Sequence, residues 1–405
     1  MRIAIASSGL GHVARGIESW AADLGAALHD RGADVLLCKG GGEATKPYER
    51  VVPCWTREGA QARRLARILP RRLSWRVGLG NNYEIEQTTF AWRLLRLLRR
   101  ERVDILHVQD PHVALLLQRA HETGLSPARV ILAHGTEERL EFLGKIAYLQ
   151  HLAPWHAEEA REAGVWREKW TTIPNFIDVE NFRPRGPGEP SAIREELGIP
   201  ADATVALTAA AIKRHHKRID YLLAEFAQTL ATPAGQNAWL IVAGGWEKET
   251  DELIQEGTRL CGDRVRFLVR FPRGRMGELY RSADLFVMTS LKEMMPIALI
   301  EACASGLPCL VHRHPVMEWM IGPGGSCVDM ATPGGLNSAL SDWLPDATRR
   351  VQAGLAAREH ALSHFSRDRV VDQILEYYQL VLHLDETVSA NATLSTVGRP
   401  TASGA

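Results

Sequence analysis

A chain of 405 residues is longer than one hydrophobic core usually serves, so the sequence predicts two domains. Its 48 basic and 48 acidic residues give a formal net charge of zero, which excludes an overall electrostatic attraction to nucleic acid. Hydrophobic residues make up 45% of the chain, enough for two cores, but no run of about 18 apolar residues would span a membrane.

The cysteines and the first residues indicate a cytoplasmic protein. Six cysteines are scattered without a C-x-x-C pair, and several lie inside apolar runs, as free thiols do in a reducing compartment. No Cys/His spacing typical of a metal site occurs. The apolar stretch at residues 3–6 is too short for the core of a signal peptide.

In the first half, short apolar runs alternate with longer amphipathic stretches, the pattern of β-α units on a parallel sheet. The expected strands are Ile3–Ser7, Asp34–Cys38, Asp104–Val108 and Val130–Ala133. The expected helices are Gly16–Arg31, Thr88–Arg100 and Val113–Thr123. The proline- and glycine-rich residues 183–190 cannot continue a helix or a central strand, so they read as a linker.

After the linker the same alternation restarts. The expected strands are Val205–Ala210, Trp239–Ala243, Val265–Val269, Leu285–Thr289 and Pro308–Val311. The expected helices are Ile219–Leu230, Thr250–Cys261, Met276–Ser282 and Pro296–Ser305. The fold class is therefore α/β, with two Rossmann-like, doubly wound domains that would face each other across a cleft. In such sheets ligands bind outside the carboxyl ends of the strands.

Three boundaries follow from this reading. The first domain covers residues 1–183, the second covers 184–365, and a terminal helix covers 366–384. Residues 386–405, rich in Ser, Thr, Gly and Ala, are expected to be disordered.

Two stretches of the second half combine charges with the expected ends of strands. Residues 213–218 carry four cations and two histidines directly after Val205–Ala210, a position suited to a diphosphate. Glu293 lies in the turn before a helix that opens at Pro296, and unpaired N–H groups from Ile297 onward suit a phosphate. Glu301 lies inside that helix. A plain reading remains open, in which Glu293 only complements the helix dipole and Glu301 is solvated.

Residues 293–308 resemble the E-x7-E signature of retaining glycosyltransferase family four, the group 1 transferases of the GT-B type. Further segments resemble that family in its usual order, over some 370 residues. They are Arg15-Gly16-Ile17-Glu18, His134-Gly135, Ile173-Pro174-Asn175, Phe182-Arg183-Pro184, Glu278-Leu279-Tyr280 and Phe365-Ser366.

The resemblance implies roles for the residues around the second Rossmann-like sheet. Glu293 would contact the transferred sugar, and Glu301 would bind the ribose of the nucleotide. Residues 295–297 (Met295, Pro296 and Ile297) would surround the diphosphate, with N–H donors from Met295 and Ile297. Lys217 takes the place of the family's lysine, whereas Lys213 and Arg214 are both candidates for its arginine.

In the first domain the resemblance places Gly16 near the donor phosphate or sugar, where its missing side chain lets the backbone approach. His134 follows an expected strand and would hydrogen-bond a hydroxyl of the transferred sugar. The family usually has a glycine at the position of Arg15. Sequence alone gives His107 a packing role at a strand end.

The implied reaction moves a sugar from a nucleotide-diphosphate sugar to a hydroxyl of a small-molecule, glycan or lipid-linked acceptor. No enzymic nucleophile is evident, so the acceptor would attack from the face that the diphosphate leaves, with retention. No D-x-D motif occurs, so no cofactor and no required metal ion are expected. Two alternatives stay open: a nucleotide-sugar 2-epimerase of the same architecture, and a non-catalytic protein that binds nucleotide sugars.

Two basic segments belong to the first domain. Residues 63–76 contain six arginines without an acid, and residues 93–102 interleave arginines with leucines. A basic amphipathic surface suits an anionic acceptor or peripheral contact with the inner face of a membrane, whereas a merely solvated face is the alternative.

Overall fold

The computed structural model describes residues 1–13, 15–68, 78–189 and 191–397, and beyond residue 383 it describes the backbone alone. The chain divides into two compact units, one of Met1–Ile173 with Val371–Ala405 and one of Pro174–Val370. The sequence places the boundary later, after residue 183. Residues 174–183 belong to the second unit, because they pack against it. Ile177 donates its backbone N–H to Phe365 O, and the ring of Phe182 packs edge-on against Tyr280.

Within the described residues, the first unit is built on a parallel seven-stranded sheet of order β3-β2-β1-β4-β5-β6-β7. Its strands are β1 (Arg2–Ser7), β2 (Asp34–Lys39), β3 (Glu49–Val51), β4 (Ile105–Val108), β5 (Arg129–Ala133), β6 (Tyr148–His151) and β7 (Thr171–Thr172). The continuous apolar runs of β1 and β4 are buried, as expected for strands that are covered on both faces.

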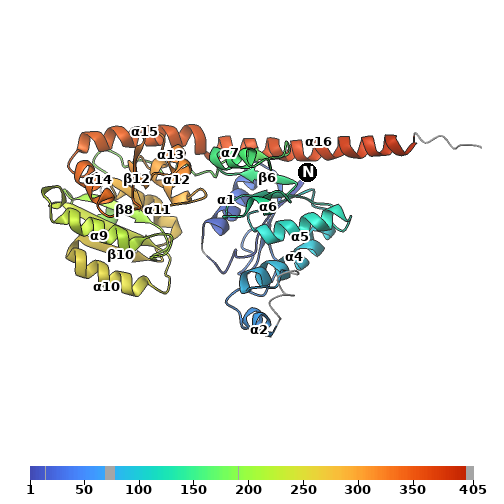
Figure 1. Cartoon of the computed structure of the whole chain (residues 1–405), viewed down its shortest axis with the longest axis horizontal. Coiled ribbons are helices and arrows are strands. Elements are labelled where there is room, and N and C mark those ends of the chain that lie inside the picture. The colour runs from blue at the N-terminus through green and yellow to red at the C-terminus, as the bar shows by residue number, and fades with distance from the viewer. Residues whose placement is uncertain (14, 69–77, 190, 398–405) are drawn as a thin grey trace, which may run out of the picture. The chain divides into compact units, whose positions relative to one another are not determined.

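Helices cover both faces of this sheet (Figure 1). They are α1 (Gly16–Asp30), α2 (Ala60–Ile68), α4 (Asn82–Arg100), α5 (Pro111–Glu122), α6 (Leu140–Leu143), α7 (Pro154–Glu162) and the part of α16 (Arg367–Val397) that belongs to this unit. Leu94 and Leu98 of α4 pack with Leu106 of β4 in the core beneath α4 and α5. On the other face, Trp20 of α1 packs against His107 of β4.

His107 fixes α16 to the sheet of the first unit. It is fully buried, and its Nδ1 lies 2.7 Å from the hydroxyl of Tyr378 on α16. Burial lowers the pKa of His107 to about 3, so the ring is neutral at physiological pH. The packing role expected for His107 agrees with this position.

The second unit carries, in the described residues, a parallel six-stranded sheet of order β10-β9-β8-β11-β12-β13. Its strands are β8 (Thr204–Ala209), β9 (Ala238–Gly244), β10 (Val265–Val269), β11 (Leu285–Met288), β12 (Cys309–His312) and β13 (Gly325–Val328). Helix α9 packs against α10 and α14, and α12 packs against α13 and α15 (Figure 1).

The described helices of the second unit lie before, between and after these strands in the chain. They are α8 (Ala192–Glu196), α9 (Ile219–Leu230), α10 (Thr250–Cys261), α11 (Met276–Arg281), α12 (Ile297–Ala304), α13 (Pro315–Ile321), α14 (Gly335–Trp343) and α15 (Ala347–Phe365). The apolar spacing of α9 buries Leu222, Leu223 and Phe226 against the sheet.

Three features differ from the sequence-based expectations. Helices were not expected at the positions of α2, α6, α7, α8, α13, α14 and α15. Strands β3, β6, β7 and β13 were not expected, because short runs such as Tyr-Leu-Gln-His in β6 lack a continuous apolar pattern. Helix α16 continues to Val397, past the end expected at residue 384, and residues 398–405 of the expected disordered tail lie outside the described residues. In the part of the chain that the structure describes, no helix is long and apolar enough to cross a membrane.

Candidate functional site

Each sheet has a point at which its strand order reverses. In the second unit the chain proceeds outward from β8 through β9 to β10, and from β11 through β12 to β13. Ligands of open α/β sheets bind outside the carboxyl ends of the two strands at such a point. The loops that follow β8 and β11 carry residues 213–218 and 289–296, so the two charged stretches meet where this topology predicts a ligand.

Lys217 and Glu293 meet in an ion pair between these loops. Lys217 Nζ contacts Glu293 Oε1, and only 9% of the Glu293 side chain is exposed. Thr289 Oγ1, at the end of β11, donates a 2.7 Å hydrogen bond to the carbonyl of Lys217 and so ties one loop to the other. The structure therefore brings together two of the residues that the sequence predicts to be catalytic.

The backbone around Lys217 is strained. His216 and Arg218 both have left-handed conformations, with φ of 73° and 52°, which non-glycine residues rarely adopt. Such strain persists where the surrounding structure holds it in place, and it concentrates at functional sites. Its effect here is to aim Lys217 and His216 together at Glu293.

The sequence predicts no individual role for His216, although it predicts that the basic run of residues 213–218 binds a diphosphate. His216 Nε2 lies 3.1 Å from the carbonyl of Lys292 and 3.7 Å from Glu293 Oε1. Because a carbonyl only accepts, Nε2 carries the hydrogen and Nδ1 is left to face other groups. The only sequence signal for His216 was its place next to Lys217.

Lys213 and Arg214 turn toward α10 instead of toward Glu293. Arg214 Nη2 lies 2.7 Å from Glu256, and Lys213 Nζ lies 3.9 Å from Glu247. The backbone N–H of Arg214 also donates to a glutamate at the start of α10. These acids draw both cations away, so the structure brings neither predicted arginine equivalent to the ion pair.

Helix α12 begins one residue later than expected. Pro296 has an extended ψ of 117° and is the cap, so Ile297 is the first helical residue. Met295 is buried, and its carbonyl accepts a 3.2 Å hydrogen bond from Asn175 Nδ2. This contact holds the turn directly before the N-terminus of α12.

Glu301 is buried to the same extent as Glu293, with 9% exposed, so it is not a solvated helix residue. The hydroxyl of Tyr280 donates a 2.8 Å hydrogen bond to Glu301 Oε2 and also lies 3.1 Å from Ala298 O. Burial, followed by the charge of Glu301, raises the pKa of Tyr280 well above its usual value, so this hydroxyl remains a donor.

The remaining predicted residues belong to the first unit. Gly16 is the first residue of α1, and a Cβ atom added there would meet nothing within 4 Å. His134 follows β5 with only 5% exposed, and its Nδ1 lies 3.3 Å from Nδ1 of His151. Its ring also packs 5.3 Å from His156, so His134 is part of a buried histidine cluster.

Comparison with known proteins identifies the family. Residues 190–360 match the family described as Glycosyl transferases group 1, and residues 14–181 match Glycosyltransferase Family 4. The chain belongs to the group 1 glycosyltransferases of family 4. Among curated relatives, D-inositol 3-phosphate glycosyltransferase 2 of Catenulispora acidiphila is 31% identical over 200 residues, which cover 47% of this chain and 46% of the relative. The chain spans about half the length of the first curated relatives that it matches.

Solved structures show the same fold. The sucrose-phosphate synthase of Thermosynechococcus elongatus superposes with a TM-score of 0.75 at 18% identity, over 95% of this chain and 99% of that chain. HepE of Anabaena, in complex with UDP and glucose, gives 0.71 at 18% identity, over 93% and 98% of the two chains. The fold of this glycosyltransferase is therefore GT-B, with two Rossmann-like domains.

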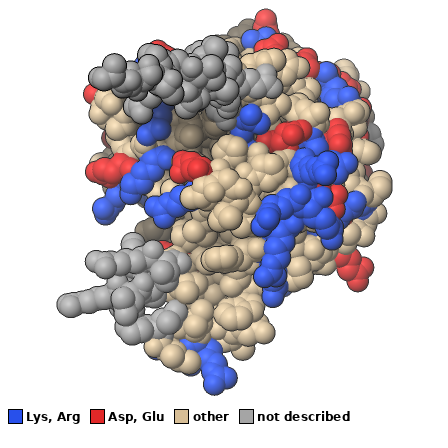
Figure 2. All heavy atoms as spheres, turned by 90° about the vertical axis from the view of Figure 1, so that its right-hand side faces the viewer, with Lys and Arg blue, Asp and Glu red and all other residues tan. Residues whose placement is uncertain are grey.

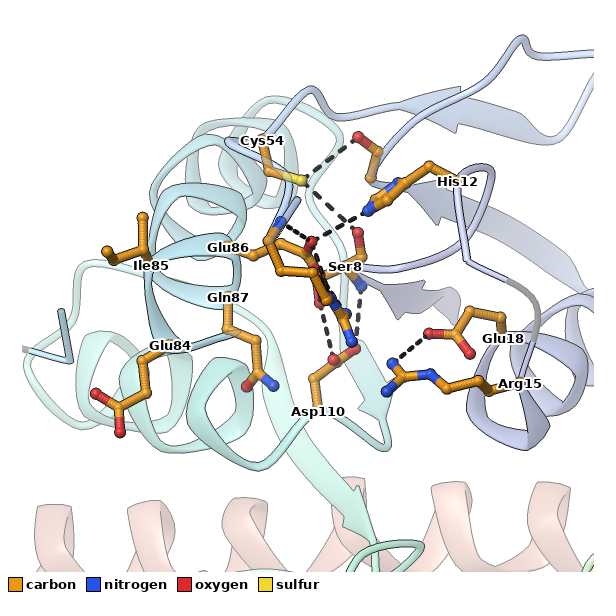
Figure 3. A network of polar contacts seen from close by, with 12 residues as sticks. Ser8, His12, Arg15, Glu18, Cys54, Glu84, Ile85, Glu86, Gln87 and Asp110 are labelled. Carbon is orange, nitrogen blue, oxygen red and sulfur yellow. Dashed lines mark hydrogen bonds and ion pairs between the residues drawn. The ribbon is translucent and has the colours of Figure 1, made fainter. Parts of the chain in front are cut away.

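The first unit of this glycosyltransferase has a reversal point of its own, between β1 and β4. A buried polar network, for which the sequence shows no motif, lies at the carboxyl ends of these strands (Figure 3). Glu86 of α4 is fully buried and binds three residues: Arg57 through its backbone N–H and guanidinium, His12 at 3.1 Å and the Ser8 hydroxyl at 3.4 Å. Burial alone would raise the pKa of Glu86, but hydrogen bonds from His12 and Arg57 outweigh it and lower the pKa to about 2.

Asp110, at the start of α5, is the second buried acid of this network. Its carboxylate accepts a 3.0 Å hydrogen bond from the backbone N–H of Ser8 and a 2.9 Å bond from the Ser8 hydroxyl. Burial raises the pKa of Asp110 to about 6, even though the hydrogen bonds from Ser8 lower it. The pKa values of Glu86 and Asp110 are therefore shifted in opposite directions, although both acids belong to one network.

We expect Asp110 to make stability fall as the pH rises through its folded pKa. Because that pKa lies above the unfolded value of 3.8, the folded protein binds the proton more tightly between pH 4 and 6. The contribution of Asp110 to the free energy of unfolding, roughly 3 kcal/mol at 1.36 kcal/mol per pKa unit, is present below pH 4 and lost above pH 6. Asp110→Asn keeps the shape and should remove this slope from the unfolding free energy, measured with urea at pH 4 to 7. A slope equal to that of the wild type would contradict the assignment.

Proposed function

We propose that this glycosyltransferase moves a sugar from a nucleotide-diphosphate sugar to an acceptor hydroxyl with retention of anomeric configuration. The observation that carries the proposal is the Lys217–Glu293 pair, which lies at the strand reversal of the second unit beside the N-terminus of α12. The binding of UDP and glucose by HepE, a protein of the same fold, supports a nucleotide donor.

In the proposed reaction the bond between the anomeric carbon and the diphosphate breaks as the acceptor oxygen attacks from the same face. Negative charge develops on the departing diphosphate, and the ammonium of Lys217 and the N–H groups that open α12 would stabilise it. The departing phosphate oxygen would take the acceptor proton. Glu293 would hold the transferred sugar near its reacting carbon, and His134 would hydrogen-bond one of its hydroxyls.

Donor hydrolysis tests this proposal without a known acceptor. A panel of α-linked nucleotide sugars, with UDP-glucose first, is incubated with the protein, and 1H NMR records the released sugar before it mutarotates. Retention predicts that the α anomer appears first. An initial β anomer would contradict retention, a 2-epimer formed without acceptor would identify an epimerase, and no turnover of any donor would favour a binding protein.

Tyr280 should matter for nucleotide affinity, because its hydroxyl holds the carboxylate proposed to bind ribose. Tyr280→Phe removes a hydrogen bond to a charged group, so we expect the nucleoside diphosphate Kd to rise roughly tenfold, equivalent to about 1.4 kcal/mol. Calorimetry measures the change. Tyr221→Phe is the matched control, since its hydroxyl bonds to Thr332 O instead, and the prediction fails if both variants bind alike.

We also propose that no divalent cation is required. The sequence has no D-x-D motif, and Lys217 with the N-terminus of α12 would supply the positive charge that a metal ion supplies elsewhere. Donor hydrolysis in excess EDTA should therefore equal the rate in Mg2+ within twofold. A loss of activity in EDTA that Mg2+ or Mn2+ restores would overturn this proposal.

Peripheral contact with an anionic membrane is proposed for the basic helices of the first unit. Arg63, Arg64 and Arg67 of α2 are exposed, whereas Arg71, Arg72 and Arg76 lie outside the described residues. On α4, Arg93, Arg96, Arg99 and Arg100 are exposed together with Trp92, whose side chain is 67% exposed. Lys and Arg side chains gather on the face shown in Figure 2. An aromatic side chain among arginines suits the interface of an anionic bilayer.

Vesicle co-sedimentation tests this contact. The protein should bind vesicles of phosphatidylglycerol and phosphatidylcholine but not vesicles of phosphatidylcholine alone. Replacing Arg96 and Arg99 by Gln should weaken binding about fivefold per arginine, at about 1 kcal/mol each. Equal binding of the variant, or binding that does not depend on lipid charge, would contradict the proposal.

A further inference from the structure

Two arginines of the first unit converge on one aromatic ring beside the end of β1. The guanidinium of Arg57 lies 4.6 Å from the centre of the Tyr83 ring, and that of Arg15 lies 6.0 Å from it. Gly9 lies against Glu18 and Arg57, because a Cβ atom there would lie 2.1 Å from Glu18 Oε1 and 3.2 Å from Arg57 Nη2. Arg15 and Arg57 thus lie beside the same ring, that of Tyr83, and we call these two residues the arginine pair.

A buried glutamate holds each arginine from behind. Arg15 Nη2 donates a 2.9 Å bond to Glu18, which is 3% exposed, and Arg57 donates through Nε and Nη2 to the fully buried Glu86. Figure 3 shows both carboxylates, with the Arg15–Glu18 bond beside the network at the reversal of the sheet. Each guanidinium is therefore fixed in orientation before any ligand arrives, which reduces the entropy lost on binding.

The atoms left for a ligand are mainly donors. Among the described residues, Nη1 of Arg57 and Nη1 and Nε of Arg15 have no hydrogen-bond partner. The Arg15 side chain is 46% exposed and that of Arg57 is 16% exposed, whereas the glutamates behind them are covered. A ligand that meets N–H donors beside an aromatic face must be rich in acceptors, and guanidinium forks match planar or tetrahedral oxyanions best.

We propose that the arginine pair binds a phosphate or carboxylate group of a substrate. The inference rests on the proposed function, because the site lies at the strand reversal of the first unit, whose basic segments suit an anionic acceptor. The oxyanion has two possible sources, the acceptor itself or the diphosphate of the donor.

Inorganic phosphate is the probe, and the full chain with Lys217→Ala is the background, since that change removes the proposed phosphate contact of the second unit. Phosphate binding is measured from the shift of the thermal unfolding midpoint, against chloride at equal ionic strength. We expect saturable binding that Arg57→Gln weakens at least tenfold and that Arg15→Gln, at a side chain that is 46% exposed, weakens severalfold. Each variant is compared with its own midpoint in chloride, so that a loss of stability does not count as a loss of binding. Arg119→Gln, at an exposed arginine of α5, is the matched control and should bind phosphate unchanged.

Three results would overturn the inference: no saturable phosphate binding in the Lys217→Ala background, unchanged binding by both arginine variants, or equal loss in the Arg119→Gln control. The source of the oxyanion follows from nucleoside diphosphate binding with Lys217 intact. If Arg57→Gln weakens it as strongly as phosphate binding, the ligand is the donor diphosphate; if affinity is unchanged, it is the acceptor. Phosphate binding at the arginine pair without any nucleotide binding would instead refute the proposed function alone.

Discussion

Lys217→Ala should lower kcat/KM for donor turnover by about 10²- to 10³-fold, the usual effect of removing one preorganised electrostatic contact to developing charge. Among the described lysines and arginines of residues 213–218, only Lys217 forms an ion pair with Glu293. The His216 ring lies farther away, with Nε2 3.7 Å from Glu293 Oε1. The loss of Lys217 would leave the departing diphosphate without that ammonium, and would leave Glu293 without its partner. Glu293→Gln, which keeps the shape and removes the charge, should cost a similar factor.

The double variant sharpens this prediction. Because Lys217 and Glu293 form one unit, the two losses should not add, and the double variant should be only slightly slower than either single variant. Lys248→Ala, an exposed lysine in the loop after β9, is the matched control and should keep wild-type kinetics. Near wild-type rates for both Lys217→Ala and Glu293→Gln would refute the assignment of this site, and multiplicative losses would show that the residues act separately.

Glu86→Gln should destabilise the first unit by about 3–5 kcal/mol, the usual cost of removing one partner from a buried ion pair. Glu86 is fully buried and binds the side chains of Arg57 and His12 as well as a backbone N–H. Glutamine can accept only part of these bonds, and it leaves the guanidinium of Arg57 without its counter-charge. The free energy of unfolding in urea, followed by the transition of the first unit, measures the loss.

The same change should alter the response to acid. The pKa of Glu86 lies below its unfolded value of 4.5, so its contribution to stability is present above pH 4.5 and is lost as the pH falls toward 2. Glu86→Gln should therefore lose most stability at neutral pH and approach the wild type at low pH. Glu58→Gln, an exposed neighbour of Arg57, should stay within about 0.5 kcal/mol of the wild type at every pH. A neutral effect of Glu86→Gln would contradict the account of the network.

Most strands and helices were predictable because their signals are local. Helices α9 and α10 have the predicted bounds, since the apolar spacing and the residues at their ends both mark them. Strand β6 could not be predicted, because Gln150 and His151 are buried there and interrupt the apolar pattern. Their burial depends on neighbouring strands and helices, which no local window of sequence contains.

The donor site was predictable in part for the same reason. Glu293 and Lys217 each lie in the loop that follows an apolar strand, and the strand order brings these loops together. The direction of Lys213 and Arg214 toward α10 depends on acids more than 30 residues away, and the role of His216 depends on a left-handed backbone that its sequence does not signal. The network around Glu86 of α4 joins this helix to the loops that contain His12 and Arg57, which are far apart in the sequence. No single motif can therefore mark it.

Calorimetric titration of the full chain with UDP, GDP, ADP, dTDP and CDP tests the central claim, that the second unit binds the diphosphate of a nucleotide donor through Lys217 and the N-terminus of α12. The account predicts that one of these nucleotides binds selectively and that Lys217→Ala weakens its binding at least tenfold. If none of the five binds at millimolar concentration, or if Lys217→Ala binds as tightly as the wild type, the donor site has been placed wrongly.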